Sequence, residues 1–412
     1  MQMIQNLRND AERIARYAIS AVTPEQAVDA ALKNRLFPGR IYLVAAGKAA
    51  WKMTEAAKRT LGDAVTDGVV ITKYQHVMGS IPGIACFEGG HPIPDENGVR
   101  GTQAALDMIE NLQPEDTVLF LLSGGASALF EKPLIPLQEL QKINQQLLAA
   151  GCDITEINTI RKRLSAVKGG RFAQWCAPAQ METIVLSDVL GDPLDMIASG
   201  PTVPDTSTCQ QALEIIERYS IEISPAAKAL LQQETPKTLK GTKTQIIGSV
   251  RQLCHAAADA CRELGYQPIL LTDVLSCEAR EAGRFLSSIL AAHAQDGRKL
   301  AFLAGGETVV HLKGTGLGGR NQELALAAAE GIAGLSHAAV ISVGSDGTDG
   351  PTDAAGGYVD GDTCKELSDK GLSYAQILEN NDAYHALQAV NGLVVTGPTG
   401  TNVNDISIAL LG

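Results

Sequence analysis

The sequence is poor in aromatic residues, in basic charge and in long apolar runs. Aromatic residues make up 4% of its 412 residues, so Ala, Leu, Ile and Val must build the cores, as is typical of parallel strands covered by helices. The net charge is −12 and no basic tract alternates with aromatic residues, which argues against a nucleic-acid partner. No apolar stretch approaches the roughly 20 residues needed to cross a bilayer, and the charged N-terminus lacks the apolar core of a signal peptide. We therefore expect no nucleic acid and no membrane among its partners.

Cysteine pairs are also missing. None of the eight cysteines forms a CxxC pair, and the seven histidines lie apart from them, so the spacing of a zinc site is absent. Scattered cysteines of this kind are typical of reduced thiols, and we expect a cytoplasmic protein.

The length predicts two or three domains at about 150 residues each. After two helices within the first 36 residues, short apolar runs alternate with longer amphipathic ones, which predicts an α/β fold with parallel sheets wrapped on both faces. The predicted strands are 41–46, 68–72, 117–122, 182–187, 244–247, 268–271, 300–304, 338–343 and 392–395. The predicted helices include 48–60, 98–111, 137–149, 208–219, 250–264, 277–294 and 320–332.

A polar segment at 234–243 separates two αβ blocks and predicts the domain boundary. We expect an N-terminal domain at 1–236 and a C-terminal domain at 237–412. The helices within residues 1–36 could pack on either block, because their sequence does not assign them to one.

Residues 341–357 hold three aspartates, Asp346, Asp349 and Asp353, among five glycines. No Lys or Arg lies between Arg320 and Lys365 to pair with them. Like charges repel, and a glycine-rich backbone loses much entropy when it becomes ordered. A bound cation or substrate is one explanation for this cluster of acids. A solvated acidic turn is the other.

Other reactive residues follow predicted strands, where open α/β sheets bind their ligands. Lys48 follows the strand 41–46 and can offer its ammonium to a phosphate. The SGGAS segment 123–127 follows the strand 117–122, and its N–H groups and hydroxyls can bind an anion or simply form a tight turn. Asp188 and Glu307 follow two further strands.

Three further features leave alternatives open. The segment 158–171 is densely cationic, and it is either a solvated helix face or a surface for an anionic substrate. Arg320 opens a helix after two glycines and can bind a carboxylate or phosphate with two parallel bonds, or it is a surface residue. His91 is either a polar loop contact or a group that orients a substrate.

Residues 314–319 match the pattern GxGxxG, which occurs in dinucleotide-binding folds. The acid expected about 20 residues further on is not cleanly placed. The match is therefore a weak indication of a nicotinamide cofactor.

Eight ordered segments together resemble the glycerate 2-kinases of the MOFRL type, a family also found under the name hydroxypyruvate reductase of the tartrate pathway. The resemblance extends from about residue 40 to the C-terminus. The segments are AAGKAAWKM, GGHPIPDENG, LLSGGASAL, INTIRKRLSAVKGGRFA, SDVLGDPLDMIASGPTVPD, GGRNQELAL, SVGSDGTDGPTDAAGG and TGPTGTNVNDI.

The resemblance implies a Rossmann-like N-terminal α/β domain and a MOFRL-type C-terminal α/β domain, with the active site in an interdomain cleft. It implies phosphorylation of D-glycerate to 2-phosphoglycerate with ATP and magnesium (Mg²⁺), in the context of glyoxylate and tartrate metabolism, and family habit suggests a homodimer. The key lysine and arginine of the family motifs match Lys48 and Arg320. This chain has Ala126 where many members have glycine, which would narrow the phosphate-binding turn slightly.

We therefore expect three catalytic residues, Lys48, Arg320 and Asp188, and three candidate metal ligands, Asp188, Asp346 and Asp349. Two alternatives remain, an NAD(P)H-dependent hydroxypyruvate reductase and a non-catalytic metabolite-binding regulator. The candidates for substrate or phosphate binding are Ser123, Gly124, Gly125, Ser127, His91, Asn158, Arg161, Glu307 and Asn321.

Overall fold

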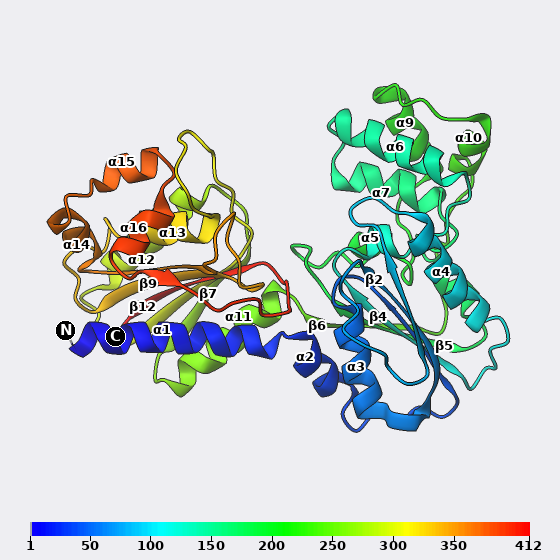
Figure 1. Cartoon of the computed structure of the whole chain (residues 1–412), viewed down its shortest axis with the longest axis horizontal. Coiled ribbons are helices and arrows are strands. Elements are labelled where there is room, and N and C mark those ends of the chain that lie inside the picture. Colours follow the sequence, from blue (N-terminus) through cyan, green and yellow to red (C-terminus); the bar gives the residue numbers. More distant parts are fainter. Residues whose placement is uncertain (1) are drawn as a thin grey trace. The chain divides into compact units, whose positions relative to one another are not determined.

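The computed structural model describes residues 2–412, with side chains from residue 6 onward, and contains two compact units (Figure 1). Unit 2 comprises Pro24–Ile247, and unit 1 combines the N-terminal segment ending at Thr23 with Gly248–Gly412. The sequence-based division lies earlier, at 236/237. Helix α1 (Gln2–Ala21) packs on α11 (Val250–Glu263), whereas α2 (Pro24–Leu32) packs on α3 (Ala50–Leu61). The two N-terminal helices thus belong to different units.

Unit 2 contains a six-stranded sheet in the order β3-β2-β1-β4-β5-β6. The pairs from β3 through β5 are parallel, which confirms the expected strand direction for this sheet. One strand of the six, β3, was not predicted. The strands are β1 (Ile41–Ala46), β2 (Val65–Lys73), β3 (Ile84–Gly89), β4 (Thr117–Ser123), β5 (Gln180–Leu186) and β6 (Thr242–Gly248).

Both faces of this sheet are buried. Alternate β1 residues, among them Val44, join one core cluster with Phe120 of β4 and Leu106 of α4 (Glu96–Met108). The intervening residue Leu43 is also buried, and α3 contacts β1, β2 and β4. Near-continuous apolar strands such as these are expected when helices cover both faces of a parallel sheet.

Two segments of unit 2, one between β4 and β5 and one between β5 and β6, form a separate group of helices (Figure 1). These helices share a second hydrophobic cluster that includes Ile143, Ile160 and Ile215. They are α6 (Leu137–Ala149), α7 (Ile154–Arg163), α9 (Cys209–Arg218) and α10 (Pro225–Leu231). Shorter helical segments of unit 2 are η1 (Gly62–Ala64), α5 (Ala126–Leu129), α8 (Arg171–Trp175) and η2 (Ile197–Ser199).

Unit 1 contains a second six-stranded sheet, in the order β11-β10-β9-β12-β8-β7. Only β7 and β8 pair in parallel, whereas β12 runs antiparallel to both β8 and β9, and β10 runs antiparallel to β9 and β11. The expectation of a parallel sheet is therefore wrong here, because the C-terminal strand β12 enters the middle of the sheet from the opposite end. The strands are β7 (Gln267–Leu275), β8 (Leu300–Gly306), β9 (Ala338–Gly344), β10 (Gly356–Asp360), β11 (Leu393–Val394) and β12 (Asp405–Leu411).

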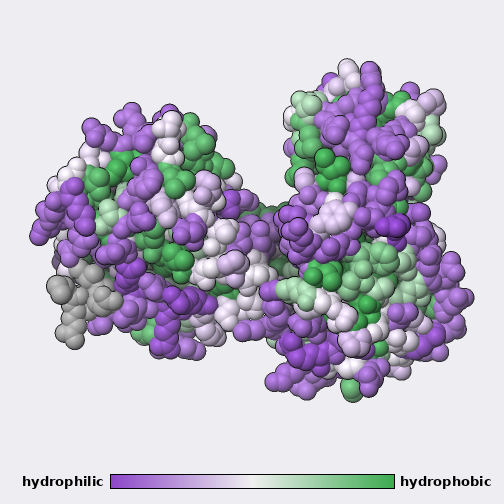
Figure 2. Space-filling view, in the orientation of Figure 1, coloured by the Kyte–Doolittle hydropathy of each residue, from purple (hydrophilic) through white to green (hydrophobic). Residues whose placement is uncertain are grey.

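Helices cover both faces of the unit 1 sheet. Helices α1 and α11 contact it on one side, and α12 (Ala279–His293) and α13 (Arg320–Ala328) on the other (Figure 1). Three short helices, α14 (Thr363–Asp369), α15 (Tyr374–Glu379) and α16 (Ala383–Ala389), complete the unit. On the face shown in Figure 2, hydrophilic residues predominate between separate hydrophobic patches. Among the described residues, no helix has the length and apolar composition needed to span a bilayer.

Candidate active site

Lys48 lies in the turn between β1 and α3, at the carboxyl end of the unit 2 sheet. Its backbone N–H donates to the carbonyl of Gly124 at 2.8 Å, and the hydroxyl of Ser123 accepts from the N–H of Ala49 at 3.1 Å. A Cβ atom on Gly47, whose φ is 122°, would lie 2.3 Å from Oγ of Ser123, so this close approach requires glycine. These contacts fix the backbone of Lys48 and leave its side chain partly exposed.

Other predicted residues gather at the glycine turn after β4. A Cβ atom on Gly124 would lie 2.1 Å from Oδ2 of Asp188, so this carboxylate packs against the turn. A Cβ atom on Gly125 would lie 2.9 Å from Cδ2 of His91 and 3.3 Å from Cγ of Lys48. The structure therefore brings five predicted residues together. We call this group the Lys48 cluster: Lys48, His91, Gly124, Gly125 and Asp188.

The electrostatics of the Lys48 cluster suit an anion. Burial and the nearby ammonium of Lys48 lower the pKa of His91 below its ordinary value, so the imidazole is neutral at pH 7 and retains one N–H donor. The backbone N–H groups of Gly125, Ala126 and Ser127 form no hydrogen bond with any described residue. Successive free N–H groups beside a cation bind phosphate or carboxylate oxygens.

Asn158 and Arg161 lie on α7, and no hydrogen bond or ion pair joins either to the Lys48 cluster within the described residues. Asn158 is buried, and its Oδ1 accepts from the hydroxyl of Ser199 at 2.8 Å. The Nε of Arg161 is buried without a hydrogen-bond partner among the described residues, and burial lowers the pKa of its guanidinium. Asn158 therefore holds the loop that follows β5.

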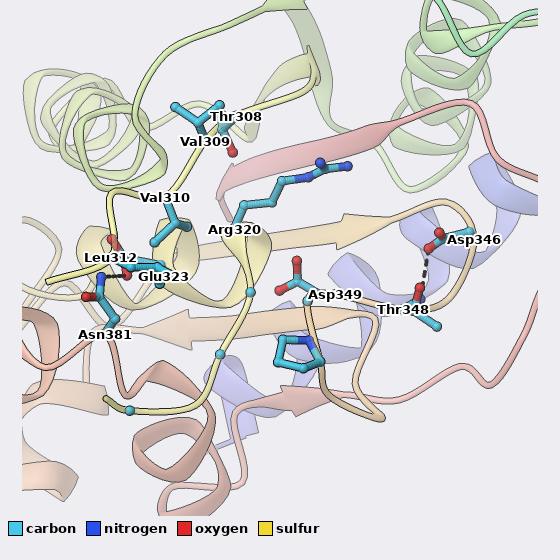
Figure 3. Close-up of a pocket in the computed structure, with 15 residues that line it drawn as sticks. Thr308, Val309, Val310, Leu312, Arg320, Glu323, Asp346, Thr348, Asp349 and Asn381 are labelled. Atoms are coloured by element: carbon cyan, nitrogen blue, oxygen red, sulfur yellow. Dashed lines mark hydrogen bonds between the residues drawn. The ribbon is translucent and has the colours of Figure 1, made fainter. Parts of the chain in front are cut away.

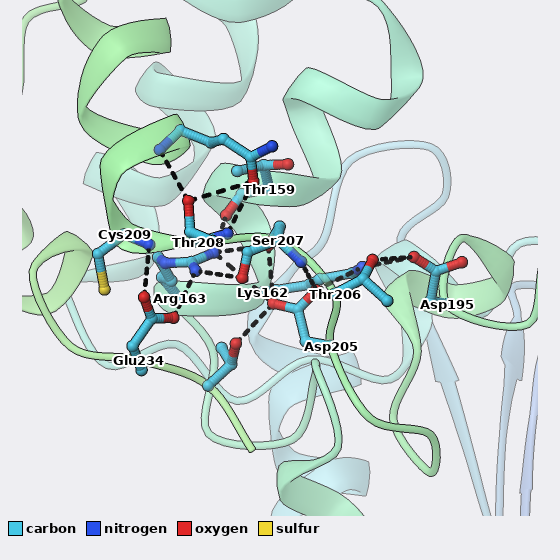
Figure 4. Close-up of polar contacts among 12 residues, drawn as sticks. Thr159, Lys162, Arg163, Asp195, Asp205, Thr206, Ser207, Thr208, Cys209 and Glu234 are labelled. Carbon is cyan, nitrogen blue, oxygen red and sulfur yellow. Dashed lines mark hydrogen bonds and ion pairs between the residues drawn. The ribbon is translucent and has the colours of Figure 1, made fainter. Parts of the chain in front are cut away.

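The cationic segment is largely buried, so it is not the solvated helix face considered from the sequence. Lys162 is 1% exposed, and its Nζ lies 3.0 Å from Asp205 and 3.3 Å from Asp195 (Figure 4). Burial alone would raise the pKa of Asp205, but a hydrogen bond from Thr235 and the charge of Lys162 lower it to about 2. The carboxylate therefore stays ionised, and the network ties α7 to the loop after β5.

Lys168 is a second buried cation. Its Nζ donates to the carbonyl oxygens of Phe130 at 3.0 Å and Ala198 at 3.5 Å, and lies 3.7 Å from Glu131. Burial lowers the pKa of this ammonium to about 8, although Glu131 acts in the opposite direction. Ala198 and Ser199 adopt φ values of 52° and 62°, a conformation that side chains disfavour. Lys168 thus helps to stabilise a strained part of the loop.

Arg320 opens α13 in unit 1 and is held by two carboxylates. Its Nε and Nη2 donate to Asp405 at 2.6 and 3.1 Å, and its Nη1 donates to Glu307 at 2.6 Å. Asp405 is 6% exposed. Burial raises its pKa to about 6, although Arg320 acts in the opposite direction. This arrangement fixes the orientation of the guanidinium.

Asp349 caps the N-terminus of α13. Its Oδ1 accepts from the N–H of Asn321 at 3.1 Å and its Oδ2 from that of Gln322 at 2.8 Å. A Cβ atom on Gly319 would lie 2.3 Å from Cγ of Asp349. Asn321 is 1% exposed, donates to Asp349 at 3.3 Å and accepts from Ser342 at 2.6 Å. Both residues are therefore occupied with fixing this end of α13.

Asp346 is more accessible. Its Oδ1 accepts from the N–H of Thr348 at 2.9 Å, and its side chain is partly exposed. A Cβ atom on Gly344 would lie 3.3 Å from this oxygen and 3.5 Å from Oδ1 of Asp405, so two carboxylates approach one point. Nevertheless, the described residues contain no group of three His, Cys, Asp or Glu side chains arranged to hold a metal ion.

A pocket of about 570 Å³ in unit 1, which we call the α13 pocket, brings several of these residues to its walls (Figure 3). Arg320, Asp346 and Asp349 line it together with Glu323 and a group of apolar residues. The apolar group consists of Val309, Val310, Leu312 and Pro351.

Most backbone N–H groups of the GxGxxG segment are already hydrogen-bonded within unit 1. The N–H groups of residues 313–317 all donate to Asn380, Asn381 and Asp382, by side-chain or backbone oxygens. The first helical N–H groups that follow donate to Asp349. Dinucleotide-binding turns use such groups for the pyrophosphate, so these N–H groups are not available to one.

Sequence reasoning missed Asp405, and it missed Glu131, the buried carboxylate that faces Lys168 of the cationic segment. The available signal for Asp405 was an acid at the start of the short apolar run DISIALL, although its partner Arg320 lies 85 positions away. Glu131 and Lys168 are 37 positions apart, and only the folded chain brings them together.

Two family descriptions match the chain. A domain of unknown function, DUF4147, matches residues 10–232, and the MOFRL family matches residues 300–405. The chain is 50% identical to the D-glycerate 2-kinase of Thermotoga maritima over 99% of both chains. A protein of Agrobacterium vitis with the provisional name hydroxypyruvate reductase is 39% identical, with 97% of this chain and 93% of that protein covered.

A solved structure also matches over nearly the whole length. The crystal structure of glycerate kinase from Thermotoga maritima superposes with a TM-score of 0.95 at 50% identity, and covers 99% of this chain and 100% of that one. The α/β architecture of both units is therefore also that of a solved protein.

Proposed function

Because this chain belongs to the family of MOFRL-type glycerate kinases, we propose that it is an ATP-dependent D-glycerate 2-kinase. It transfers the γ-phosphoryl group of ATP to the 2-hydroxyl of D-glycerate and releases 2-phospho-D-glycerate and ADP. The observation that carries this proposal is the 50% identity, over 99% of both chains, to a D-glycerate 2-kinase.

The Lys48 cluster supports the chemistry of phosphoryl transfer. The reaction forms a bond between the 2-oxygen and the γ-phosphorus, breaks the bond to the β-phosphate oxygen, and moves the hydroxyl proton to a base. We assign the base role to Asp188, which packs on the glycine turn. Lys48 neutralises charge on the transferred phosphoryl group, and the free N–H groups of Gly125 to Ser127 bind its oxygens.

Arg320 supplies a second cation, which we assign to the phosphates of ATP. A guanidinium suits phosphate oxygens because it donates two parallel hydrogen bonds. Asp405 and Glu307 already hold Arg320 in one orientation, so little conformational entropy is lost when a phosphate binds. We therefore regard Asp405 as a positioning residue that acts through Arg320.

Magnesium fits best at Asp346. Mg²⁺ in ATP-dependent enzymes is usually bound by one or two carboxylates together with the substrate phosphates, so the absence of a three-ligand group among the described residues agrees with this mode. Asp346 is partly exposed, whereas both carboxylate oxygens of Asp349 already accept N–H groups. When bound, Mg²⁺ would neutralise phosphate charge.

The reductase alternative has less support. It rests on the GxGxxG match and on the provisional name of a relative, but the N–H groups of residues 313–317 are already occupied. A non-catalytic regulator would leave the cation, base and free N–H groups of the Lys48 cluster without a task. We also propose a cytoplasmic location, with which eight free cysteines agree.

A coupled assay tests the proposal. The enzyme is supplied with ATP, Mg²⁺ and D-glycerate, and enolase is added without a mutase. Formation of phosphoenolpyruvate is expected, because enolase accepts the 2-phosphate. Release of ADP without phosphoenolpyruvate would point to the 3-position or to another acceptor, and oxidation of NADH with hydroxypyruvate would favour the reductase.

A further inference from the structure

Arg320 and Asp346 of the α13 pocket are assigned above to the phosphates of ATP and to Mg²⁺, but the rest of the pocket has no assigned ligand and is larger than D-glycerate requires. The pocket measures about 570 Å³, which lies within the range of about 300–1,000 Å³ that is typical of sites for drug-sized ligands. A three-carbon acid would leave most of this volume empty. The pocket therefore fits a larger molecule.

One wall of the pocket is apolar and exposed. Val309 is 50% exposed and Leu312 is 79% exposed, and Val310 lies between them in sequence. Figure 3 shows Val310 and Leu312 on one side of Arg320 and Asp346 on the other. We call Val309, Val310 and Leu312 the apolar wall. Exposed apolar residues clustered in a cavity are typical of ligand-binding sites.

The charge of the lining disfavours an anion in the body of the pocket. Asp346, Asp349 and Glu323 face a single lining cation, Arg320. Arg320 is already paired with two carboxylates, and Glu323 is paired with Arg280, so the acidic excess of the lining comes from Asp346 and Asp349. The α13 N-terminus, which would otherwise attract an anion, is capped by Asp349. The occupant beside the apolar wall is therefore a neutral group with an apolar face.

Hydrogen bonds fix the residues that follow the apolar wall. Asn381 accepts from the N–H groups of Lys313 and Gly314 and donates to Glu323 at 2.9 Å. The N–H groups of Val310 and Leu312 form no hydrogen bond with any described residue, so they are available to the polar edge of a ligand. A preformed apolar surface with a few free backbone donors suits a planar heterocycle.

We propose that the α13 pocket binds the nucleoside half of ATP, with the base against the apolar wall. The phosphates then leave the pocket on the side of Arg320. This inference rests on the proposed kinase function, and it assigns the nucleoside to unit 1.

The test uses adenosine, because the inference predicts that the neutral nucleoside binds without its phosphates. In the full-length enzyme, adenosine should bind by calorimetry and should inhibit competitively against ATP but not against D-glycerate. The variant Leu312→Asp should weaken ADP and adenosine binding at least tenfold and raise the KM for ATP, with the KM for D-glycerate within twofold of wild type. Leu312→Gln serves as an uncharged second variant, and thermal unfolding checks that each variant is folded.

The matched control is Phe285→Asp, which places the same charge on a 59% exposed apolar residue of α12, outside the pocket. It should bind ADP as wild type does. A folded Leu312→Asp variant with wild-type ADP affinity would overturn the inference, and so would an equal rise in the KM for D-glycerate. An inactive wild-type enzyme that still binds adenosine at the apolar wall would instead overturn the kinase proposal alone.

Discussion

Replacement of Asp405 by Asn separates the effect of this residue on stability from its effect on activity. The change keeps the shape of the side chain but removes the charge that orients Arg320. Asp405 titrates at about 6 in the folded chain, against an ordinary value of 3.8, because burial outweighs the attraction of Arg320. This shift of roughly two units corresponds to about 3 kcal/mol, at about 1.4 kcal/mol per unit.

Proton binding by Asp405 determines whether the free energy of unfolding rises or falls with pH. Between pH 3.8 and about 6, the folded chain binds the Asp405 proton more tightly than the unfolded chain, so the stability contributed by this group falls as pH rises. Above pH 6 the carboxyl group is ionised in both states, and the loss of stability caused by its burial is complete. Asp405→Asn removes the dependence, so its free energy of unfolding relative to wild type should rise by up to about 3 kcal/mol between pH 4 and pH 7. Urea denaturation at both pH values measures this change.

The activity of Asp405→Asn should fall, whereas its free energy of unfolding relative to wild type should rise with pH. The amide introduced by Asp405→Asn keeps one acceptor oxygen but lacks the second and the charge, so Arg320 loses one of its two hydrogen bonds from Nε and Nη2. A misplaced charge of this kind costs about 100-fold in turnover. In wild type, kcat/KM should fall as pH drops through about 6, where Asp405 becomes protonated. The variant should lose this limb.

If Asp405→Asn keeps activity within threefold of wild type at pH 8, or retains the same acid limb, then Asp405 does not orient a catalytic Arg320. Arg320→Ala serves as the reference, because it removes the cation itself.

Two further predictions concern residues that stabilise the N-terminus of α13 and the loop after β5. Asp349→Ala removes the cap from the N–H groups of Asn321 and Gln322, so the free energy of unfolding should fall by about 1–3 kcal/mol; an unchanged unfolding midpoint in urea would contradict the capping role. Lys168 titrates at about 8 in the folded chain because of burial, so wild type should gain stability between pH 8 and 10.5 as this ammonium deprotonates. Lys168→Met should lack this gain when urea denaturation is compared at pH 7.5 and 9.5, and an equal gain in both proteins would exclude the assignment.

The apolar pattern of the sequence predicted most of the strands. The runs 41–46 and 338–343 correspond to β1 and β9, whose residues are all buried. The pattern missed β3, most of whose residues are only partly buried, and β10, where glycine opens the strand. It also missed β12, although this strand is as fully buried as β1 and β9. An apolar run gives no strand direction, so the antiparallel entry of β12 between β8 and β9 could not be predicted from periodicity.

The position of site residues at strand ends was predictable, because parallel strands place their carboxyl ends at one edge. Lys48 and Asp188 follow β1 and β5 and meet at the glycine turn after β4. The partners of the charged residues were not predictable. Arg320 pairs with Asp405 and Lys162 with Asp205 across 85 and 43 positions, and only tertiary packing sets such distances.

The central claim is that the Lys48 cluster catalyses phosphorylation of D-glycerate at the 2-hydroxyl. Its most direct test is turnover of Lys48→Ala in the enolase-coupled assay, beside wild type and beside Lys52→Ala, a change of a nearby lysine that pairs with Glu25. Wild type and Lys52→Ala should both yield phosphoenolpyruvate, and Lys48→Ala should lose about 10²–10⁵ in kcat. A folded Lys48→Ala enzyme with turnover near that of wild type would contradict the account.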